Sequence, residues 1–166
     1  MKGILMIIFF ALAMGSLQAQ TDINAPYWLN RNIPSFRVVA AADSSFFEES
    51  QLAKNKIIIF MLFNPECEHC QRQFSMLVKI PKLQKEAQVI LASTETWEKI
   101  SAFYYKYKLQ KYPFIRLCKD YKYTFGAHFQ PKTVPVIAIY NKQQQFHFIK
   151  QGEIKREELE AAVKPL

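Results

Sequence analysis

An uninterrupted apolar run dominates the middle of the chain, where residues 57–63 read IIIFMLF. A run of this length that opens with β-branched residues is typical of a strand buried on both faces, as in a parallel sheet. Cys67 and Cys70 follow after a short break. Cys70 then starts a stripe at helical spacing that continues to Phe74 and Leu77. The sequence therefore predicts a buried strand, a short loop and two thiols at the start of a helix.

Residues 1–19 form a separate unit with the composition of a secretory signal peptide. Lys2 gives a positive start, residues 4–14 are apolar, and Ala19 offers a small residue for cleavage. The apolar core is shorter than the ~20 residues of a membrane-spanning helix, and an uncleaved anchor is the alternative interpretation. We expect a mature chain that begins near Gln20 in the periplasm or another extracytoplasmic space. Membrane contact should be weak or absent after cleavage.

Charge and composition limit the classes of function. The net charge is +8, and loss of Lys2 with residues 1–19 would leave 21 basic and 14 acidic side chains, or +7. The lysines are dispersed, as on a solvated surface, and secretion argues against a nucleic-acid partner. The chain has only four glycines and neither a GxGxxG nor a GxxxxGK[ST] pattern. The sequence therefore offers no nucleotide-binding loop.

The remaining patterns alternate between strand and helix. Residues 20–35, with several Asn and Pro, are expected to be an irregular lead-in to one domain over residues 36–166, and residues 41–50 to be a loop. Strands are expected at 36–40, 57–63, 89–92, 114–117, 136–140 and 146–150, and helices after Cys67, from Trp97, within 120–128 and over 155–163. Pro81 and Pro113 are expected to end two helices. This order predicts an α/β fold with a central mixed sheet of four to five strands flanked by helices, its parallel half preceding an antiparallel hairpin.

The dithiol predicts redox chemistry. Backbone N–H groups at a helix start carry partial positive charge and stabilise a thiolate at the first cysteine. Cys67 is therefore the expected nucleophile. Cys70, one turn inside, would attack a mixed disulfide with a partner and release that partner. Exchange needs no cofactor, so we expect none beyond a redox-active Cys67–Cys70 disulfide.

Three charged or titratable side chains beside the cysteines are expected to tune the thiol pKa. His69 can add positive charge or a hydrogen bond, which favours the thiolate and makes the disulfide a stronger oxidant. Glu66 and Glu68 act in the opposite direction, because nearby negative charge raises a thiol pKa. The sequence leaves the balance between these effects open. A surface His69 without a role is the alternative.

Metal binding is the other interpretation of two cysteines at this spacing. A structural zinc ion needs four ligands, and beyond Cys67 and Cys70 only Cys118, His128 and His147 are candidates, with no second close pair. We therefore expect no metal site and interpret Cys118 as a buried, inert thiol. A binding module or a metal carrier that uses Cys67 and Cys70 is the alternative function.

A second candidate site lies at Thr133, Val134 and Pro135. A proline immediately before a buried strand fits either a cis peptide bond or a trans proline that begins the strand. A cis Val134–Pro135 bond would turn the backbone of Thr133 and Val134 outward, where it can pair with an extended substrate. These three residues are therefore the expected substrate-binding segment.

Two motifs together resemble the thioredoxin superfamily: FNPECEHC after a buried strand, and VPVIAIYNK at a later one. The chain looks most like the secreted TlpA-like thiol–disulfide oxidoreductases. The resemblance implies a thioredoxin-like fold from about residue 34 to the end, with Cys67 attacking, Cys70 resolving and Pro135 as the cis-proline that faces them. It implies disulfide exchange with envelope proteins, for which we favour the reducing direction. The partners would be protein thiols or disulfides and an unidentified redox donor.

The sequence also departs from relatives of that superfamily. Thioredoxin carries a buried acid where this chain has Met61, a tryptophan where it has Glu66, and Gly-Pro where it has Glu68 and His69. A proton relay would therefore have to come from Glu66 or Glu68, or be absent. Asn64 stands where peroxiredoxins carry a threonine, which argues against peroxidase activity.

Overall fold

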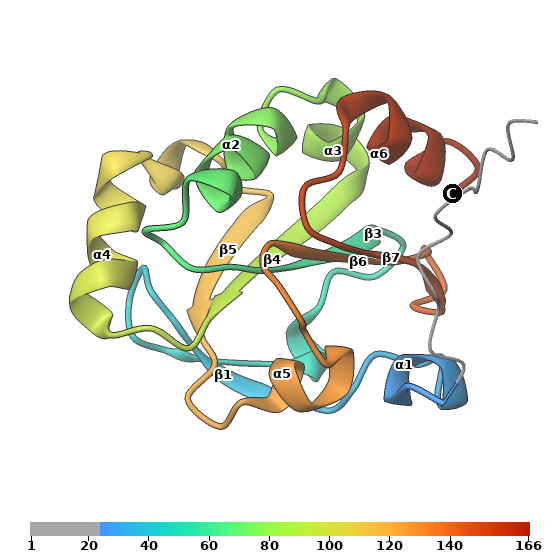
Figure 1. Ribbon diagram of the computed structural model, residues 1–166, viewed down its shortest axis with the longest axis horizontal. Coiled ribbons are helices and arrows are strands. Elements are labelled where there is room, and N and C mark those ends of the chain that lie inside the picture. Colours follow the sequence, from blue (N-terminus) through green and yellow to red (C-terminus); the bar gives the residue numbers. More distant parts are fainter. Residues whose placement is uncertain (1–23) are drawn as a thin grey trace, which may run out of the picture.

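The computed structural model describes residues 24–166, so the expected signal peptide lies outside the described residues. Within them, one seven-stranded sheet runs through the molecule in the order β2-β1-β5-β4-β3-β6-β7 (Figure 1). The strands are β1 (Arg37–Ala40), β2 (Phe46–Glu48), β3 (Ile57–Leu62), β4 (Ala87–Ser93), β5 (Ile115–Lys119), β6 (Val136–Tyr140) and β7 (Phe146–Gln151). The α-helices are α1 (Pro26–Leu29), α2 (Glu68–Leu77), α3 (Pro81–Glu86), α4 (Trp97–Lys106), α5 (Thr124–Phe129) and α6 (Arg156–Val163), and the 3-10 helices are η1 (Glu49–Gln51) and η2 (Leu109–Lys111).

The predicted apolar run forms the middle of the sheet. All six residues of β3 are buried, and the strand pairs in parallel with β4 and antiparallel with β6. β4 pairs in parallel with β5, so the parallel half precedes the antiparallel β6–β7 hairpin, as predicted. Since β3 has a neighbour on each side and helices over each face, its sequence shows no polar alternation.

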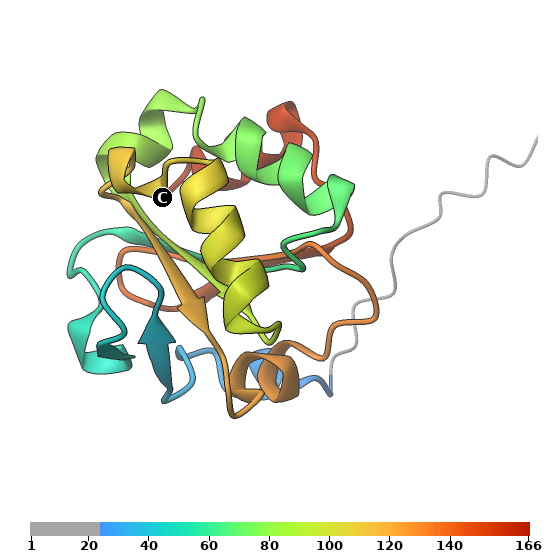
Figure 2. The same ribbon diagram turned by 90° about the vertical axis from the view of Figure 1, so that its left-hand side faces the viewer.

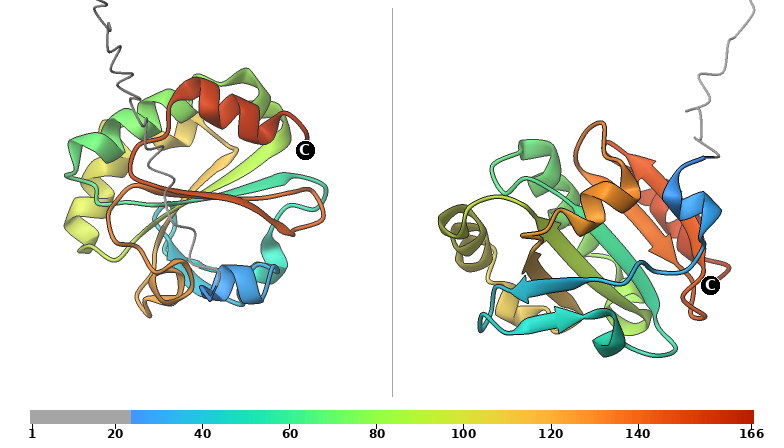
Figure 3. Two further views of the ribbon diagram at one scale, coloured as in Figure 1. Left: turned by 45° about the vertical axis from the view of Figure 1, so that its right-hand side comes forward. Right: turned by 90° about the horizontal axis from the view of Figure 1, so that it is seen from below.

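Each face of the sheet has its own hydrophobic core, and the side chains of β3 alternate between the two. Ile57, Ile59 and Met61 face the core under α2, α3, α4 and α6, whereas Ile58 and Phe60 face the core over α1 and α5. Figure 3 shows the two groups of helices on opposite sides of the sheet, and Figure 2 shows α4 lying across it beside α2. The fold is therefore a three-layer α/β arrangement.

The sheet has seven strands, more than the four to five expected for its centre: six lie at the ranges predicted for strands, and β2 is added at one edge. β2 lies inside residues 41–50, which the sequence indicated to be a loop, and pairs with β1 through Val38 and Phe47. The lead-in also differs from the expectation, since α1 buries Tyr27 in the second core. Short segments of this kind take their structure from the surface that they cover.

Two prolines mark helix boundaries differently from the expectation. Pro81 begins α3 at its first turn, where the missing N–H has no partner to lose. α4 ends at Lys106, well before Pro113, and Lys108 then adopts a left-handed backbone with φ 51°. Between residues 24 and 166, no helix has the length and apolar character needed to cross a bilayer.

Truncation of Phe60 should strongly destabilise the protein. Its ring is fully buried and lies 4.9 Å from the ring of Phe125 and 5.7 Å from that of Phe129, measured between centroids. We expect Phe60→Ala to lower the free energy of unfolding by about 3–5 kcal/mol, because it leaves a cavity in a packed core. Leu29→Ala, at a side chain 74% exposed, is the apolar control and should change it by less than ~0.5 kcal/mol. Denaturant unfolding measures both, and equal effects would contradict this account of the core.

Candidate active site

The two cysteines lie where β3 leads into α2. Cys67 is the N-cap of α2, with an extended backbone, and is half-buried. Cys70, in the first turn, is fully buried in the core beneath the helix. The first N–H groups of a helix have no partner within it and point toward the N-cap residue. The loop before Cys67 is held by Asn64, whose carbonyl accepts the Cys67 N–H at 3.1 Å.

The two thiols differ in their electrostatic environment. Burial raises the pKa of the Cys70 thiol to about 12, against a smaller opposing effect from a hydrogen bond with the Asn64 backbone. A hydrogen bond with Cys67, and the charges of Cys67 and Glu153, raise it further. That hydrogen bond also brings the two sulfurs close together. In the reduced protein Cys70 therefore stays a neutral thiol at physiological pH, and Cys67 is the sulfur that solvent reaches.

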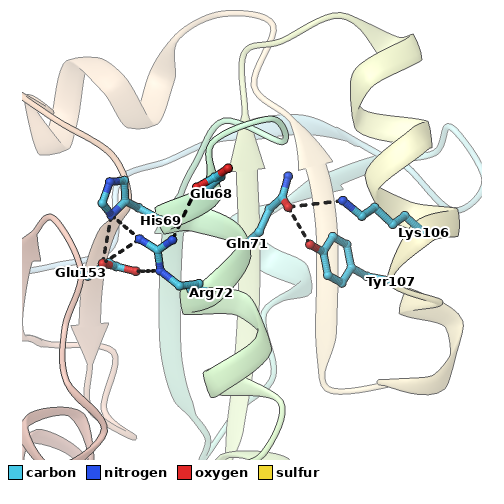
Figure 4. A network of polar contacts seen from close by, with 7 residues as sticks. All are labelled: Glu68, His69, Gln71, Arg72, Lys106, Tyr107 and Glu153. Carbon is cyan, nitrogen blue, oxygen red and sulfur yellow. Dashed lines mark hydrogen bonds and ion pairs between the residues drawn. The ribbon is translucent and has the colours of Figure 1, made fainter.

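A network of charged side chains lies on the exposed side of α2 (Figure 4). His69 Nδ1 is 2.9 Å from Glu153 Oε2, and Arg72 donates its Nε–H to Glu153 Oε1 at 2.9 Å. Arg72 Nη2 also lies 2.7 Å from His69 Nδ1. Glu68 reaches Arg72 only at 3.8 Å and is largely exposed. The hydrogen bonds from Arg72 and His69 hold the pKa of Glu153 below its usual range.

The other acid expected to tune the cysteines points away from this network. Glu66 Oε2 lies 2.6 Å from Lys99 Nζ of α4, and Lys99 also pairs with Glu95 at 3.2 Å. Glu95 in turn accepts the side-chain amide of Asn64 at 2.7 Å. The loop before Cys67 is therefore tied to α4. His69 and Glu68 both contact Arg72, whereas Glu66 pairs with Lys99.

The Val134–Pro135 peptide is cis, as predicted. Pro135 is buried, Val134 is half-buried and Thr133 is exposed. The next residue, Val136, pairs with Leu62 at the end of β3. This register brings the 133–135 segment to the same end of the sheet as the loop that leads to the cysteines, and Val134 and Cys67 pack against the same core.

A segment that the sequence analysis did not single out joins these two parts of the site. Residues 152–154, which we call the 152–154 segment, connect β7 to α6. Gly152 donates its N–H to the carbonyl of Pro135 at 2.8 Å, and Ile154 donates its N–H to Gln73 Oε1 of α2 at 2.9 Å. Gly152 has φ +83°, a conformation that side chains rarely adopt, and this explains the glycine. A glycine is typical of a turn, but nothing in the sequence indicates that Glu153 after it meets α2.

A small cavity of about 70 Å³ lies beside Val134. The ends of β3 and β4 form one side of it, through Phe63 and Thr94, and α5 with the loop after it forms the other, through Tyr123 and Pro131. The cavity has the dimensions of one short apolar side chain and lies next to the segment expected to bind substrate.

The remaining metal-ligand candidates do not join the dithiol. Cys118 is buried in the core of the opposite face, where burial raises its pKa to about 12. His128 Nε2 lies 3.1 Å from the hydroxyl of Tyr140, also on that face, and His147 is exposed on β7. In residues 24–166 no three His, Cys, Asp or Glu side chains gather as a metal site would require.

Comparison with solved structures identifies the fold. A secreted disulfide oxidoreductase of Mycobacterium tuberculosis, described as homologous to E. coli DsbE, has a TM-score of 0.65 at 16% identity and covers 79% of this chain and 96% of its own. A thioredoxin-like protein from Aeropyrum pernix has a TM-score of 0.64 at 16% identity, over 80% of this chain and 89% of its own. StoA from Bacillus subtilis has a TM-score of 0.59 at 12% identity, over 80% and 98%.

No protein-family model matches the chain, and no curated protein matches its sequence. At these identities the solved structures establish the fold alone. The chain has the thioredoxin-like α/β fold, as its dithiol and its proline motif predicted.

Proposed function

We propose that the protein is a thiol–disulfide oxidoreductase that exchanges disulfides with envelope proteins through Cys67 and Cys70. The observation that carries the proposal is the asymmetry of the pair: a half-buried Cys67 occupies the N-cap position of α2, and a buried Cys70 lies in the first turn. Such an arrangement supports a thiolate that partners can reach and a second thiol that they cannot. The likeness to a secreted disulfide oxidoreductase of the same fold adds support.

The reaction transfers two electrons from the dithiol to the partner. The Cys67 thiolate attacks one sulfur of a substrate disulfide, whose S–S bond breaks to leave a substrate thiolate and a mixed disulfide at Cys67. Cys70 then attacks the Cys67 sulfur and displaces the second substrate thiolate. The protons of the dithiol end on the two substrate thiols. The protein is left with a Cys67–Cys70 disulfide, which an unidentified donor reduces again, and no cofactor takes part.

The segment from Thr133 to Pro135 would hold the substrate polypeptide. Thr133 is exposed and Val134 is half-buried, which supports backbone pairing with an extended chain. An apolar substrate side chain near the reacting cysteine would enter the cavity beside Val134. These contacts need a polypeptide, so the proposed substrates are proteins rather than small thiols.

We infer the reducing direction and an extracytoplasmic location from the charges and from the start of the chain. The negative charge of Glu153 raises the pKa of Cys70, and negative charge opposes the thiolate and therefore favours a reducing couple. The composition of residues 1–19 supports export. His69, which contacts Glu153, would place positive charge near the thiolate and so raise the reduction potential.

Substitution of the cysteines should separate their roles. Cys67→Ser should abolish the reduction of insulin disulfides, because no other thiol is reachable. Cys70→Ala should accumulate mixed disulfides with partners, visible on gels as adducts that a reductant removes. Cys118→Ala is the matched control and should keep activity, since Cys118 lies on the opposite face of the sheet. Full activity in Cys67→Ser would refute the nucleophile and leave a binding module as the better account.

Alkylation of the reduced protein should label one cysteine only. Burial raises the pKa of both Cys70 and Cys118 to about 12, so at pH 8 only about one in ten thousand of these thiols is ionised. We expect iodoacetamide at pH 8 to modify Cys67 and to spare the other two, as measured by mass spectrometry of peptides. Labelling of Cys70 at a rate similar to that of Cys67 would contradict the asymmetry on which the mechanism depends.

A further inference from the structure

We propose that Glu153 sets the redox potential of the dithiol by neutralising the positive charge that Arg72, with His69 beside it, brings to the start of α2. In this inference, which rests on the proposed function, Glu153 is a positioning residue that acts through its two partners. Removal of its charge should make the Cys67–Cys70 couple more oxidising.

The position of Glu153 supports this role. It lies in the 152–154 segment, far along the chain from the cysteines, and reaches the first turns of α2 from outside (Figure 4). Its carboxylate bonds Arg72 through both oxygens, at 2.9 and 3.3 Å, and His69 at 2.9 Å. Arg72 and His69 lie on α2 within five residues of Cys67. One carboxylate therefore engages the two cationic or protonatable side chains that α2 places nearest the sulfurs.

The backbone around Glu153 keeps it in place. Gly152 is bonded to the Pro135 carbonyl and Ile154 to Gln73, so both neighbours of Glu153 are fixed to the site itself. Gln73 and Ile154 are buried. Because the backbone on both sides of Glu153 is fixed, its side chain loses little further conformational entropy when it pairs with Arg72. This favours a persistent contact over a transient surface ion pair.

The other carboxylates near the cysteines have other partners or contact Arg72 at a longer distance. Glu66 pairs with Lys99 on the α4 side, and Glu68 approaches Arg72 only at 3.8 Å. On α6, Arg156 pairs with Glu160 at 2.8 Å. Among the described residues, Glu153 is the carboxylate that hydrogen-bonds both Arg72 and His69, so its removal leaves Arg72 with only the longer ion pair to the exposed Glu68.

Charge near the sulfurs acts on the reduction potential through the thiolate. Positive charge near the sulfurs stabilises the thiolate, hence the reduced protein, and raises the reduction potential. The Glu153 carboxylate opposes this in two ways: it neutralises Arg72, and its own negative charge reaches Cys70, whose pKa burial raises first and Glu153 raises further. Loss of the carboxylate charge therefore raises the reduction potential of the Cys67–Cys70 couple, which makes its disulfide a stronger oxidant.

The test is the equilibrium of the Cys67–Cys70 couple with glutathione in Glu153→Gln. Glutamine keeps an oxygen that accepts from Arg72, so the substitution removes charge with little change of shape. We expect about a fivefold shift toward the reduced protein, the upper range for a partly exposed charge, or about 20 mV for a two-electron couple. The rate of Cys67 alkylation should reach its half-maximum at lower pH in the same variant.

Three further variants make the test specific. Glu153→Asp keeps the charge and should remain near the unchanged protein. Glu160→Gln removes a carboxylate paired with an arginine on α6 and should leave both readouts unchanged. Because Glu153 also contacts His69 at 2.9 Å, the comparison is repeated in a His69→Asn background, where the shift should persist through Arg72.

Failure of the inference about Glu153 and failure of the proposed function would give different results. A Glu153→Gln protein with the potential and alkylation profile of Glu160→Gln would overturn the inference, as would a loss of thermal stability with neither readout moved, which would mark a purely structural contact. If the unchanged protein formed no Cys67–Cys70 disulfide in any glutathione buffer, the proposed function itself would fail. That result is independent of Glu153.

Discussion

The packing of α2 against β3 is the constraint on which the candidate site depends. It puts the sulfur of Cys70 into the hydrophobic core and leaves that of Cys67 at the helix start, although the two residues are only three positions apart. The desolvation that raises the pKa of Cys70 and the position of Cys67 at the polar N-terminal end of the helix are consequences of the same packing. A helix docked one residue out of register would expose Cys70 and remove the difference between the thiols.

The site also depends on parts of the chain that meet only in the folded protein. The cysteines follow the third strand, Pro135 precedes the sixth, and Glu153 follows the seventh. Pairing of β3 with β6 brings the first two to one end of the sheet, and the β6–β7 hairpin returns the chain to the same end. The hairpin therefore positions the 152–154 segment, and a change in its length would move Glu153 away from α2 without altering the cysteines.

The sequence predicted those features whose causes are local or strongly periodic. The apolar run of β3, the thiols at the start of α2 and the proline before β6 each carry their own signal, and together they were enough to identify the thioredoxin-like fold. The strand β2 and helix α1 were missed, since their few residues gain stability from the core that they cover. The contacts of Glu66 and Glu153 could not be predicted for a related reason. The sequence around an exposed glutamate does not indicate its partner, which is Lys99 for Glu66 and Arg72 for Glu153.

Exposed charges are usually weak contributors to stability, and this makes them suitable for control of a redox couple. The potential responds to the difference in energy between the thiolate and disulfide states, so a charge that barely affects folding can still shift that difference. Deep burial fixes Cys70 in one state and leaves little to adjust. The adjustable part lies at the helix start, where His69 and Arg72 are half in solvent and share one carboxylate. On the proposed function, the core of this protein determines which sulfur reacts, and the exposed side of α2 adjusts the reduction potential of the pair.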